Sequence, residues 1–277
     1  MKVKLIKHLG QNFLTDKDVL KKIITAAELK PDDIVLEIGP GTGILTFELA
    51  KKVKGVIAIE KDKRMCEILE NELNVRNVRN VQIVNADILK IFPPEADQPW
   101  AGNEFSMTNY KIVANIPYYL TSPLIRKFLE AGNQPKLMVL MVQKEVAQRI
   151  CPPRRARSSG EAGAKPPKMS LLSIAVQFYA EPKIIAYVSK NSFYPVPKVD
   201  SAILKIEPRM NANLEPNERE LFFKLVKQGF SAKRKMLKNN LKINGEILEK
   251  INLNPKIRPE ELSVSDWIKL FTLLKGA

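Results

Sequence analysis

Asn115, Ile116, Pro117 and Tyr118 combine an amide, a proline-restricted turn and an aromatic ring directly after the apolar run 110–114. The run is typical of a buried strand, and open α/β sheets carry their chemistry at the carboxyl ends of parallel strands. The Asn115 side-chain oxygen and the Ile116 carbonyl can accept both hydrogens of an exocyclic amine, and the Tyr118 ring can stack on the attached base. These residues therefore predict a site for an adenine or cytosine amino group.

The elements that must position this tetrapeptide alternate between apolar runs and amphipathic segments. Thr15 to Asp18 resembles a capping box and predicts the start of a helix that continues to about Glu28. The alternation predicts an α/β fold, in which helices cover both faces of a parallel sheet. Strands are expected at 34–38, 55–60, 81–84, 110–115, 136–142, 172–180 and 201–207, and further helices at 44–52, 63–73, 121–131 and 144–150.

The pattern changes after Pro208, where only helical segments follow. We expect helices at 216–228, 232–241, 245–250 and 265–274, which predict a small all-helical domain at 209–277 after a larger domain at 1–208. Residues 151–168 are rich in Pro, Gly, Ser and Arg and contain almost nothing to bury. This segment is expected to be a mobile basic loop.

Composition restricts the classes of function. The 277 residues carry a formal charge of +15, which favours a polyanionic partner such as nucleic acid. No apolar run is long enough to predict a membrane span. The single histidine, His8, argues against a Ser-His-Asp triad and against a Cys/His metal site, so no metal is expected. Cys66 and Cys151 form no CxxC pair, which fits a cytoplasmic protein.

A glycine-rich turn at 39–43 lies between an expected strand and an expected helix. Ile44 occupies the place where a dinucleotide fingerprint needs its third glycine, so pyrophosphate binding is disfavoured. Glu60 ends the next expected strand, and its carboxylate can accept hydrogen bonds from both hydroxyls of a ribose. Asp87, after the third strand, can accept a hydrogen bond from an adenine amino group, and Ile88 can pack on the adenine ring. The set describes an adenosine pocket without a diphosphate, which S-adenosylmethionine fits.

The chain resembles the ribosomal RNA adenine N6-dimethyltransferases, in particular those of the bacterial small subunit. That family has a Rossmann-like class I methyltransferase domain followed by a small helical domain, and it uses S-adenosyl-L-methionine. The resemblance covers nearly the whole chain. It is carried by 8–14, 37–43, Glu60, Asp87, 115–118, the block Ser192-Phe-Tyr-Pro-Val-Pro-Lys-Val-Asp-Ser201 and the segment 228–241.

The resemblance also implies roles for single residues. Gln11 and Asn12 would close over the methionine end of the cofactor, where Gly39 and Gly41 would line its path. The full set implied for the cofactor is Gln11, Asn12, Leu14, Gly39, Gly41, Glu60, Lys61, Asp87, Ile88 and Asn115.

The same resemblance implies that residues 115–118 hold the target adenine and that Phe193 stacks on it. On spacing alone, Phe193 would instead be expected to be a core aromatic beside a proline turn. The basic run of Lys233, Arg234, Lys235 and Lys238 would grip RNA phosphates, and its alternative is a solvated helix face.

The activity implied is dimethylation of adenine N6 at two adjacent adenosines in a hairpin loop of 16S ribosomal RNA. The expected partner of this monomeric enzyme is the immature 30S particle. The alternatives are a 23S ribosomal RNA methyltransferase that confers macrolide resistance, and an RNA-binding assembly or transcription factor without catalysis. A DNA adenine methyltransferase ranks below these because no DNA-recognition domain is visible. The 151–168 segment is longer than the family's usual connection, which affects expected RNA contacts rather than the catalytic strands.

Overall fold

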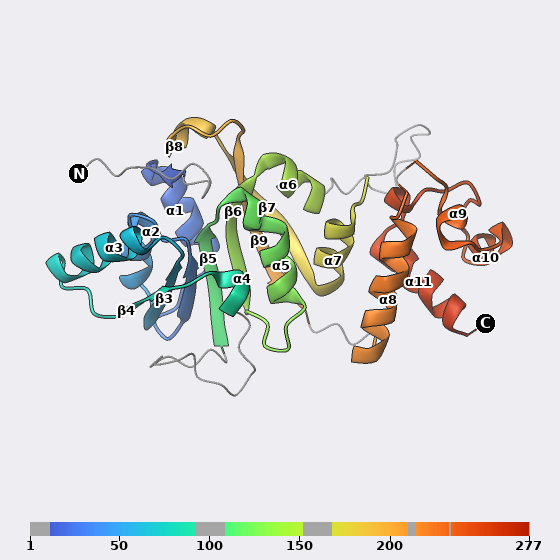
Figure 1. Cartoon of the computed structure of the whole chain (residues 1–277), viewed down its shortest axis with the longest axis horizontal. Helices are drawn as coiled ribbons and strands as arrows, with labels where there is room; N and C mark the ends of the chain where they lie inside the picture. Colours follow the sequence, from blue (N-terminus) through green and yellow to red (C-terminus); the bar gives the residue numbers. More distant parts are fainter. Residues whose placement is uncertain (1–11, 92–108, 152–167, 210–213, 233, 277) are drawn as a thin grey trace. The chain divides into compact units, whose positions relative to one another are not determined.

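A seven-stranded sheet forms the centre of the larger part of the chain in the computed structural model, which describes residues 12–91, 109–151, 168–209, 214–232 and 234–276 (Figure 1). The strand order is β4-β3-β2-β5-β6-β9-β7. The first five strands in this order pair in parallel, and the last two pair antiparallel at one edge. The predicted α/β architecture is confirmed. The strands are β2 (Ile34–Ile38), β3 (Gly55–Glu60), β4 (Val81–Asn85), β5 (Tyr110–Asn115), β6 (Leu137–Gln143), β7 (Ala180–Val188) and β9 (Ser201–Pro208).

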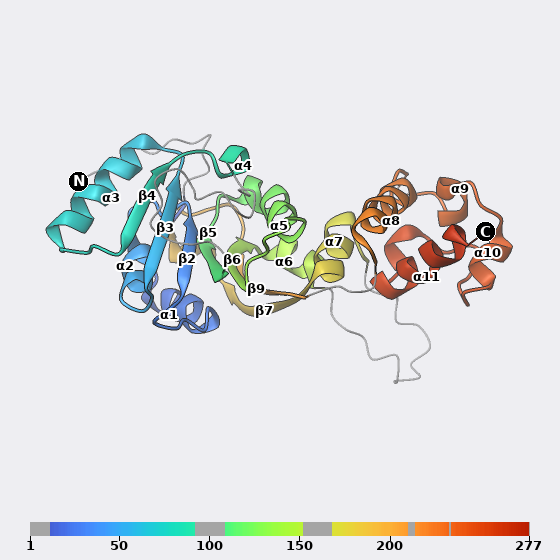
Figure 2. The ribbon, with the colours of Figure 1, turned by 90° about the horizontal axis from the view of Figure 1, so that it is seen from below.

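Helices follow the parallel strands and cover both faces of the sheet, as the views in Figures 1 and 2 show. Helices α1, α2 and α3 lie on one face, and α4 and α5 on the other. A separate two-stranded ribbon joins β1 (Phe13–Leu14) to β8 (Phe193–Tyr194). The helix bounds are α1 (Lys17–Ala26), α2 (Ile44–Ala50), α3 (Lys63–Val75), α4 (Ile88–Ile91), α5 (Thr121–Leu129) and α6 (Lys144–Ile150).

The start of α1 corrects one detail of the sequence prediction. The cap is Asp16 rather than Thr15, because the Asp16 carboxylate accepts hydrogen bonds from the backbone N–H groups of Asp18 and Val19. Thr15 instead donates its hydroxyl to the Ser192 carbonyl at 3.1 Å. The capping region thereby fastens the start of α1 to the segment before β8.

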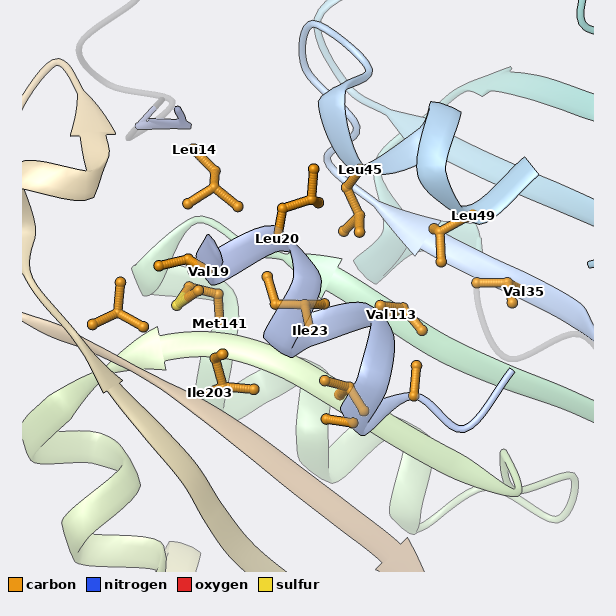
Figure 3. Packing of buried hydrophobic residues seen from close by; sticks show 14 of the residues in the cluster. Leu14, Val19, Leu20, Ile23, Val35, Leu45, Leu49, Val113, Met141 and Ile203 are labelled. Atoms are coloured by element: carbon orange, nitrogen blue, oxygen red, sulfur yellow. The ribbon is translucent and has the colours of Figure 1, made fainter. Parts of the chain in front are cut away.

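The main core lies between α1, α2 and the sheet face beneath them (Figure 3). Val19 and Ile23 of α1 point toward the strands, while Leu45 and Leu49 extend the same layer from α2. Apolar positions on α1 recur at helical spacing, so one stripe of the helix is buried. The strand residues below it include Val35, Val113, Val139, Met141 and Ile203.

The segment 172–180 is a helix, so the strand predicted there is wrong. Residues Leu171–Tyr179 form α7, and the edge strand β7 follows directly at Ala180. A short, mostly apolar run suits a buried helix as well as a buried strand, and the side chains of α7 are buried around most of its circumference. Pro182 is tolerated in β7 because that strand lies at the sheet edge.

The chain divides into two compact units, one made of 1–147 and 180–208 and the other of 148–179 and 209–277. The sequence prediction divided the chain at 208 alone, whereas the structure groups α7 with the C-terminal helices. Phe178 of α7 stacks on Phe222 at 4.9 Å between ring centroids, and Tyr179 stacks on Phe223 at 5.5 Å. The C-terminal helices are α8 (Pro216–Gly229), α9 (Leu237–Leu241), α10 (Gly245–Glu249) and α11 (Val264–Lys275).

No helix within the described ranges is both long and apolar enough to cross a membrane. The same residues contain no group of three or more His, Cys, Asp or Glu side chains that could hold a metal ion.

Candidate active site at the carboxyl edge of the sheet

A pocket opens at the carboxyl ends of β2, β3, β4 and β5, where the parallel strands bring their terminal residues together. It contains the predicted glycine turn, both predicted acids and the whole 115–118 tetrapeptide. The lining also includes residues that the sequence analysis did not select. The full lining is Asn12, Phe13, Leu14, Glu37, Ile38, Gly39, Pro40, Gly41, Thr42, Ile44, Leu45, Ile59, Glu60, Lys61, Ala86, Asp87, Ile88, Asn115, Ile116, Pro117, Tyr118, Tyr119 and Leu120.

Two glycines of the turn have backbone conformations that other residues rarely adopt. Gly41 has a φ of +56°, and a Cβ there would lie 2.8 Å from Phe13 Cε1. Gly39 has a φ of +70° and donates its N–H to the Ile59 carbonyl at 2.9 Å. Glycine adopts positive φ without steric cost, so both conformations depend on this residue type. The turn is held against β3, and the Phe13 ring covers its outer side.

Glu60 connects the end of β3 to this turn. Its Oε1 accepts the Asp62 N–H at 2.9 Å, and its Oε2 accepts the Gly41 N–H at 3.3 Å. Burial raises the pKa of the Glu60 carboxyl, and the backbone N–H donors oppose the rise by stabilising the anion. The carboxylate oxygens also line the pocket, where further lone pairs can accept hydroxyl groups.

Asp87 and Lys61 form an ion pair across the pocket wall, with 3.0 Å between Lys61 Nζ and Asp87 Oδ2. The other carboxylate oxygen accepts the Leu89 N–H at 3.0 Å. The hydrogen bond from Lys61 lowers the pKa of Asp87, so the carboxyl is an anion at neutral pH. A ligand amino group that reaches Asp87 must share this carboxylate with Lys61.

Asn115 stands at the end of β5 with its amide orientation fixed by one contact. Its Nδ2 donates to the Asn12 carbonyl at 3.1 Å. A carbonyl can only accept, so the amide nitrogen must face Asn12 and Oδ1 must face the other way. The contact joins β5 to the residue before β1 and presents an acceptor oxygen from a side chain that lines the pocket.

Ile116, Pro117 and Tyr118 continue the chain out of β5 in a rigid turn. Ile116 is only 2% exposed, and Pro117 has φ −54° and ψ 132°. Proline disfavours helical backbone in the residue before it, which restricts the direction of the Ile116 carbonyl. The Tyr118 hydroxyl lies 2.8 Å from Ser201 Oγ, which anchors the ring, and burial raises the pKa of this phenol. The next ring, Tyr119, is 53% exposed at the pocket.

Glu37 is a functional candidate that the sequence reasoning missed. It is 1% exposed near the carboxyl end of the fully buried strand β2, where it lines the pocket. Among the described residues, neither Glu37 Oε2 nor Thr46 Oγ1 has a hydrogen-bond partner at bonding distance. Burial raises the pKa of Glu37 to about 8; the nearby Thr46 hydroxyl opposes this rise, and the negative charge of Glu60 adds to it. A carboxylate inside an apolar strand was the available signal.

The remaining predicted residues fall in different places. Leu14 and Ile88 line the pocket with Asn12, Lys61 and Asn115, whereas Gln11 lies outside the described residues. Phe193 is 2% exposed and belongs to the core cluster beside Leu14, so its face is covered in this structure. Its stacking role stays a prediction.

The predicted RNA-binding run is not the helix that was expected. Arg234 and Lys235 are exposed and occupy a turn, and α9 begins only at Leu237. Lys238 lies within α9 and is half-buried, while Lys233 falls outside the described residues. The early turn follows from Met236, whose extended backbone caps α9 and ends any helix that precedes it.

Comparison with known proteins agrees with this geometry. A family model described as ribosomal RNA adenine dimethylase matches residues 3–275 of the chain. The chain belongs to the ribosomal RNA adenine dimethylase family. A dimethylase relative in Dehalococcoides mccartyi (strain BAV1), named ribosomal RNA small subunit methyltransferase A, is 40% identical over 276 residues, which covers 97% of this chain and 88% of the relative.

Two solved structures share the dimethylase fold along nearly the whole chain. A dimethyladenosine transferase from Plasmodium falciparum has a TM-score of 0.75 and 29% identity, and the match covers 95% of this chain and 98% of the other. The 23S rRNA methyltransferase ErmE has a TM-score of 0.72 and 28% identity over 95% of this chain and 100% of its own. The fold of this dimethylase is therefore that of the Rossmann-like class I methyltransferases, and the protein is an enzyme.

Proposed function

We propose that this enzyme uses S-adenosyl-L-methionine to dimethylate adenine N6 at two adjacent adenosines of small-subunit (16S) ribosomal RNA, in the cytoplasm. The observation that supports the chemistry is the fixed orientation of the Asn115 side-chain amide, close to the glycine turn. A Cβ built on Gly39 would lie 3.9 Å from the backbone carbonyl oxygen of Asn115 and 3.6 Å from Pro117 Cδ. A donor held by the turn and an amine held by Asn115 would thus be neighbours. The small-subunit target is favoured by the 40% identical relative over the 28% identical 23S enzyme.

The residues of the pocket fit the proposed cofactor. Glu60 offers carboxylate lone pairs to ribose hydroxyls, and Asp87 offers an anion to an adenine amino group beside the apolar Ile88. The Oε2 atom of the buried Glu37 carboxyl has no hydrogen-bond partner among the described residues, which suits the ammonium of a methionine moiety. When bound, S-adenosylmethionine supplies an electrophilic methyl group.

Asn115 and Ile116 would activate the target nitrogen through its hydrogens. The lone pair of adenine N6 is delocalised into the ring, which makes the nitrogen a poor nucleophile. Asn115 Oδ1 and the Ile116 carbonyl would accept the two N–H groups and favour a geometry in which the lone pair leaves the ring plane. Positioning of this kind, rather than a strong base, would provide most of the rate enhancement.

Aromatic rings would hold the base that has left its stack. Tyr118 is anchored through Ser201, and Phe193 is the second ring that the resemblance implies. A π face favours a cation nearby, and the methylated amine carries a positive charge before it loses its proton. That proton is acidic enough to pass to water, so no histidine is required at the attack step. Extrusion of the base costs least in single-stranded loops.

The proposal is tested with Asn115→Ala in the intact protein. We expect kcat for methyl transfer to fall by at least about 100-fold, because an acceptor that positions the reacting amine is lost. Binding of ribosomal RNA should stay within about threefold of wild type, because one side chain contributes little to a contact dominated by backbone phosphates. Asn74→Ala, at an exposed position of α3, is the matched control and should retain full activity. Unchanged methyl transfer by Asn115→Ala would contradict the mechanism.

The target is tested separately by mapping the product. Wild-type protein with labelled cofactor is incubated with immature small subunits and, in parallel, with 23S ribosomal RNA, and dimethyladenine is located in each. Label confined to 16S RNA supports the proposal. Label in 23S RNA alone would transfer the function to the large subunit, and RNA binding without label would favour an assembly factor without catalysis.

A further inference from the structure

A second concave surface lies beside α1 and α2, on the side of the sheet that these helices cover. We call it the basic groove, and it is bounded by α1, α2 and the turn between α3 and β4. It encloses about 970 Å³, at the upper end of the range of about 300–1,000 Å³ that is usual for ligand sites. Among the described residues that line it, Glu48 is the one carboxylate. The lining cations are Lys17, Lys21, Lys51, Lys52, Arg76 and Arg79.

Three of these six cations have acidic neighbours three or four residues earlier in the chain. Lys21 pairs with Asp18, Lys51 with Glu48 and Arg76 with Glu72, at 3.2, 2.5 and 3.0 Å respectively. Exposed pairs of this kind contribute little and are screened by salt, so phosphate oxygens can compete with them. The remaining three, Lys17, Lys52 and Arg79, form no ion pair within the described part of the chain. The basic groove is therefore positive overall.

Contacts between α2, α3 and the turn after α3 hold the backbone that carries these positive charges in place. The Arg76 guanidinium lies over the Phe47 ring, 4.3 Å from its centroid, which ties the end of α3 to α2. Asn80 donates to the carbonyls of Ala50 and Val53 at 2.9 and 3.0 Å and so fixes the following turn to the end of α2. Cations on a rigid frame lose less entropy when they bind a polyanion than cations on a free tail.

The basic groove adjoins the active site. Thr42 and Ile44, which follow the glycine turn, line both the groove and the pocket described above. A polymer that delivers a base to the pocket can therefore extend along this face. Exposed lysines and arginines from three separate elements suit a repeating backbone charge, which positions a nucleic acid without reading its sequence.

We propose that the basic groove binds the sugar-phosphate backbone of the ribosomal RNA that delivers the target adenine. The identity of the polymer rests on the proposed function, whereas the groove itself rests on the contacts above. This surface belongs to the catalytic unit and is separate from the basic run at 233–238. It would supply affinity and register to the substrate and no chemistry.

The experiment compares two triple variants of the full-length protein. The groove variant is Lys17→Gln/Lys52→Gln/Arg79→Gln. The matched control is Lys30→Gln/Lys136→Gln/Lys183→Gln, which removes the same charge from exposed positions outside the groove. Binding to transcribed small-subunit ribosomal RNA is measured from 50 to 300 mM salt, together with KM and kcat for methyl transfer and the affinity for S-adenosylmethionine.

We expect the groove variant to lose about tenfold or more in RNA affinity and its salt slope to decrease by about 0.7–0.9 for each lost phosphate contact. KM for RNA should rise, while kcat and cofactor affinity remain unchanged, and the control should bind as wild type does.

Three outcomes would overturn the groove proposal. The first is unchanged RNA affinity in the groove variant, and the second is an equal loss of RNA affinity in both variants. The third is a loss of affinity for immature particles without a loss of affinity for naked RNA, which would assign the groove to a ribosomal protein. A different result would contradict the proposed function alone. In that case the wild-type protein transfers no methyl groups, but its RNA binding still depends on the groove.

Discussion

At the scale of single residues, the side chains at the strand ends were predictable and the buried acid between them was not. Asn115, Glu60 and Asp87 each follow an apolar run, and parallel strands bring such positions to one edge. Glu37 precedes the glycine turn by two residues, but its state depends on complete burial and on a Thr46 hydroxyl that offers it no bond at bonding distance. A carboxylate inside an apolar run indicates burial, but sequence spacing carries no information about the missing hydrogen bond.

Glu37→Gln should change how stability depends on pH. The pKa of Glu37 rises from 4.5 to about 8 in the folded protein, so the folded state retains a proton that the unfolded state has lost between these values. Wild-type stability therefore decreases as pH rises through this window. The variant lacks this loss, and its free energy of unfolding relative to wild type should increase by more than about 1 kcal/mol between pH 5 and pH 9.

Thermal or denaturant unfolding at a series of pH values measures this difference. Glu67→Gln, at an exposed position of α3, is the control and should differ from wild type by a constant amount. A constant difference for Glu37→Gln as well would show that the buried carboxyl does not hold a proton up to pH 8.

At the scale of elements, the strands were predicted where apolar runs are short and bounded by turns. The run 171–179 was misassigned because it is mostly apolar and mostly buried, and its pattern alone does not separate a buried strand from a buried helix. Its helical form follows from the aromatic partners on α8, which lie far away in sequence. Likewise, the late start of α9 reflects a cap at Met236 that has no side-chain signature.

Gly229→Ala should destabilise the helical unit. Gly229 ends α8, and a Cβ there would lie 2.3 Å from the ring of the fully buried Trp267 and 3.0 Å from Leu237. Because Trp267 cannot move aside without disturbing α11, we expect a loss of about 1–3 kcal/mol in the free energy of unfolding. Denaturant unfolding measures the loss.

Gly132→Ala is the matched control, because a Cβ at Gly132 meets nothing within 4 Å. This variant should be as stable as wild type or slightly more so, since alanine restricts the unfolded chain. If the two variants unfold alike, the packing of Trp267 against α8 is looser than the structure indicates.

At the scale of the whole molecule, the chain passes between its two units three times. It leaves the sheet unit after Ala147, returns at Ala180 and leaves again after Pro208. This path was not visible in the sequence, because the change to helical segments comes only after Pro208, where α7 has already been completed. The unit boundaries therefore depend on where the aromatic face of α7 is buried rather than on local composition.

A chain shortened to residues 1–208 should consequently expose an aromatic surface. It retains α7 but loses Phe222 and Phe223, which cover Phe178 and Tyr179 in the intact protein. We expect the shortened chain to bind a hydrophobic dye and to self-associate, as exposed apolar patches do. Fluorescence of the dye and light scattering measure both effects, with the intact protein as reference. The shortened chain with Phe178→Gln should bind less dye, because one of the two uncovered rings is removed. If the 1–208 chain is monomeric and does not bind the dye, α7 refolds against the sheet unit. A domain boundary at residue 208 would then describe the molecule better than the two units of the structure.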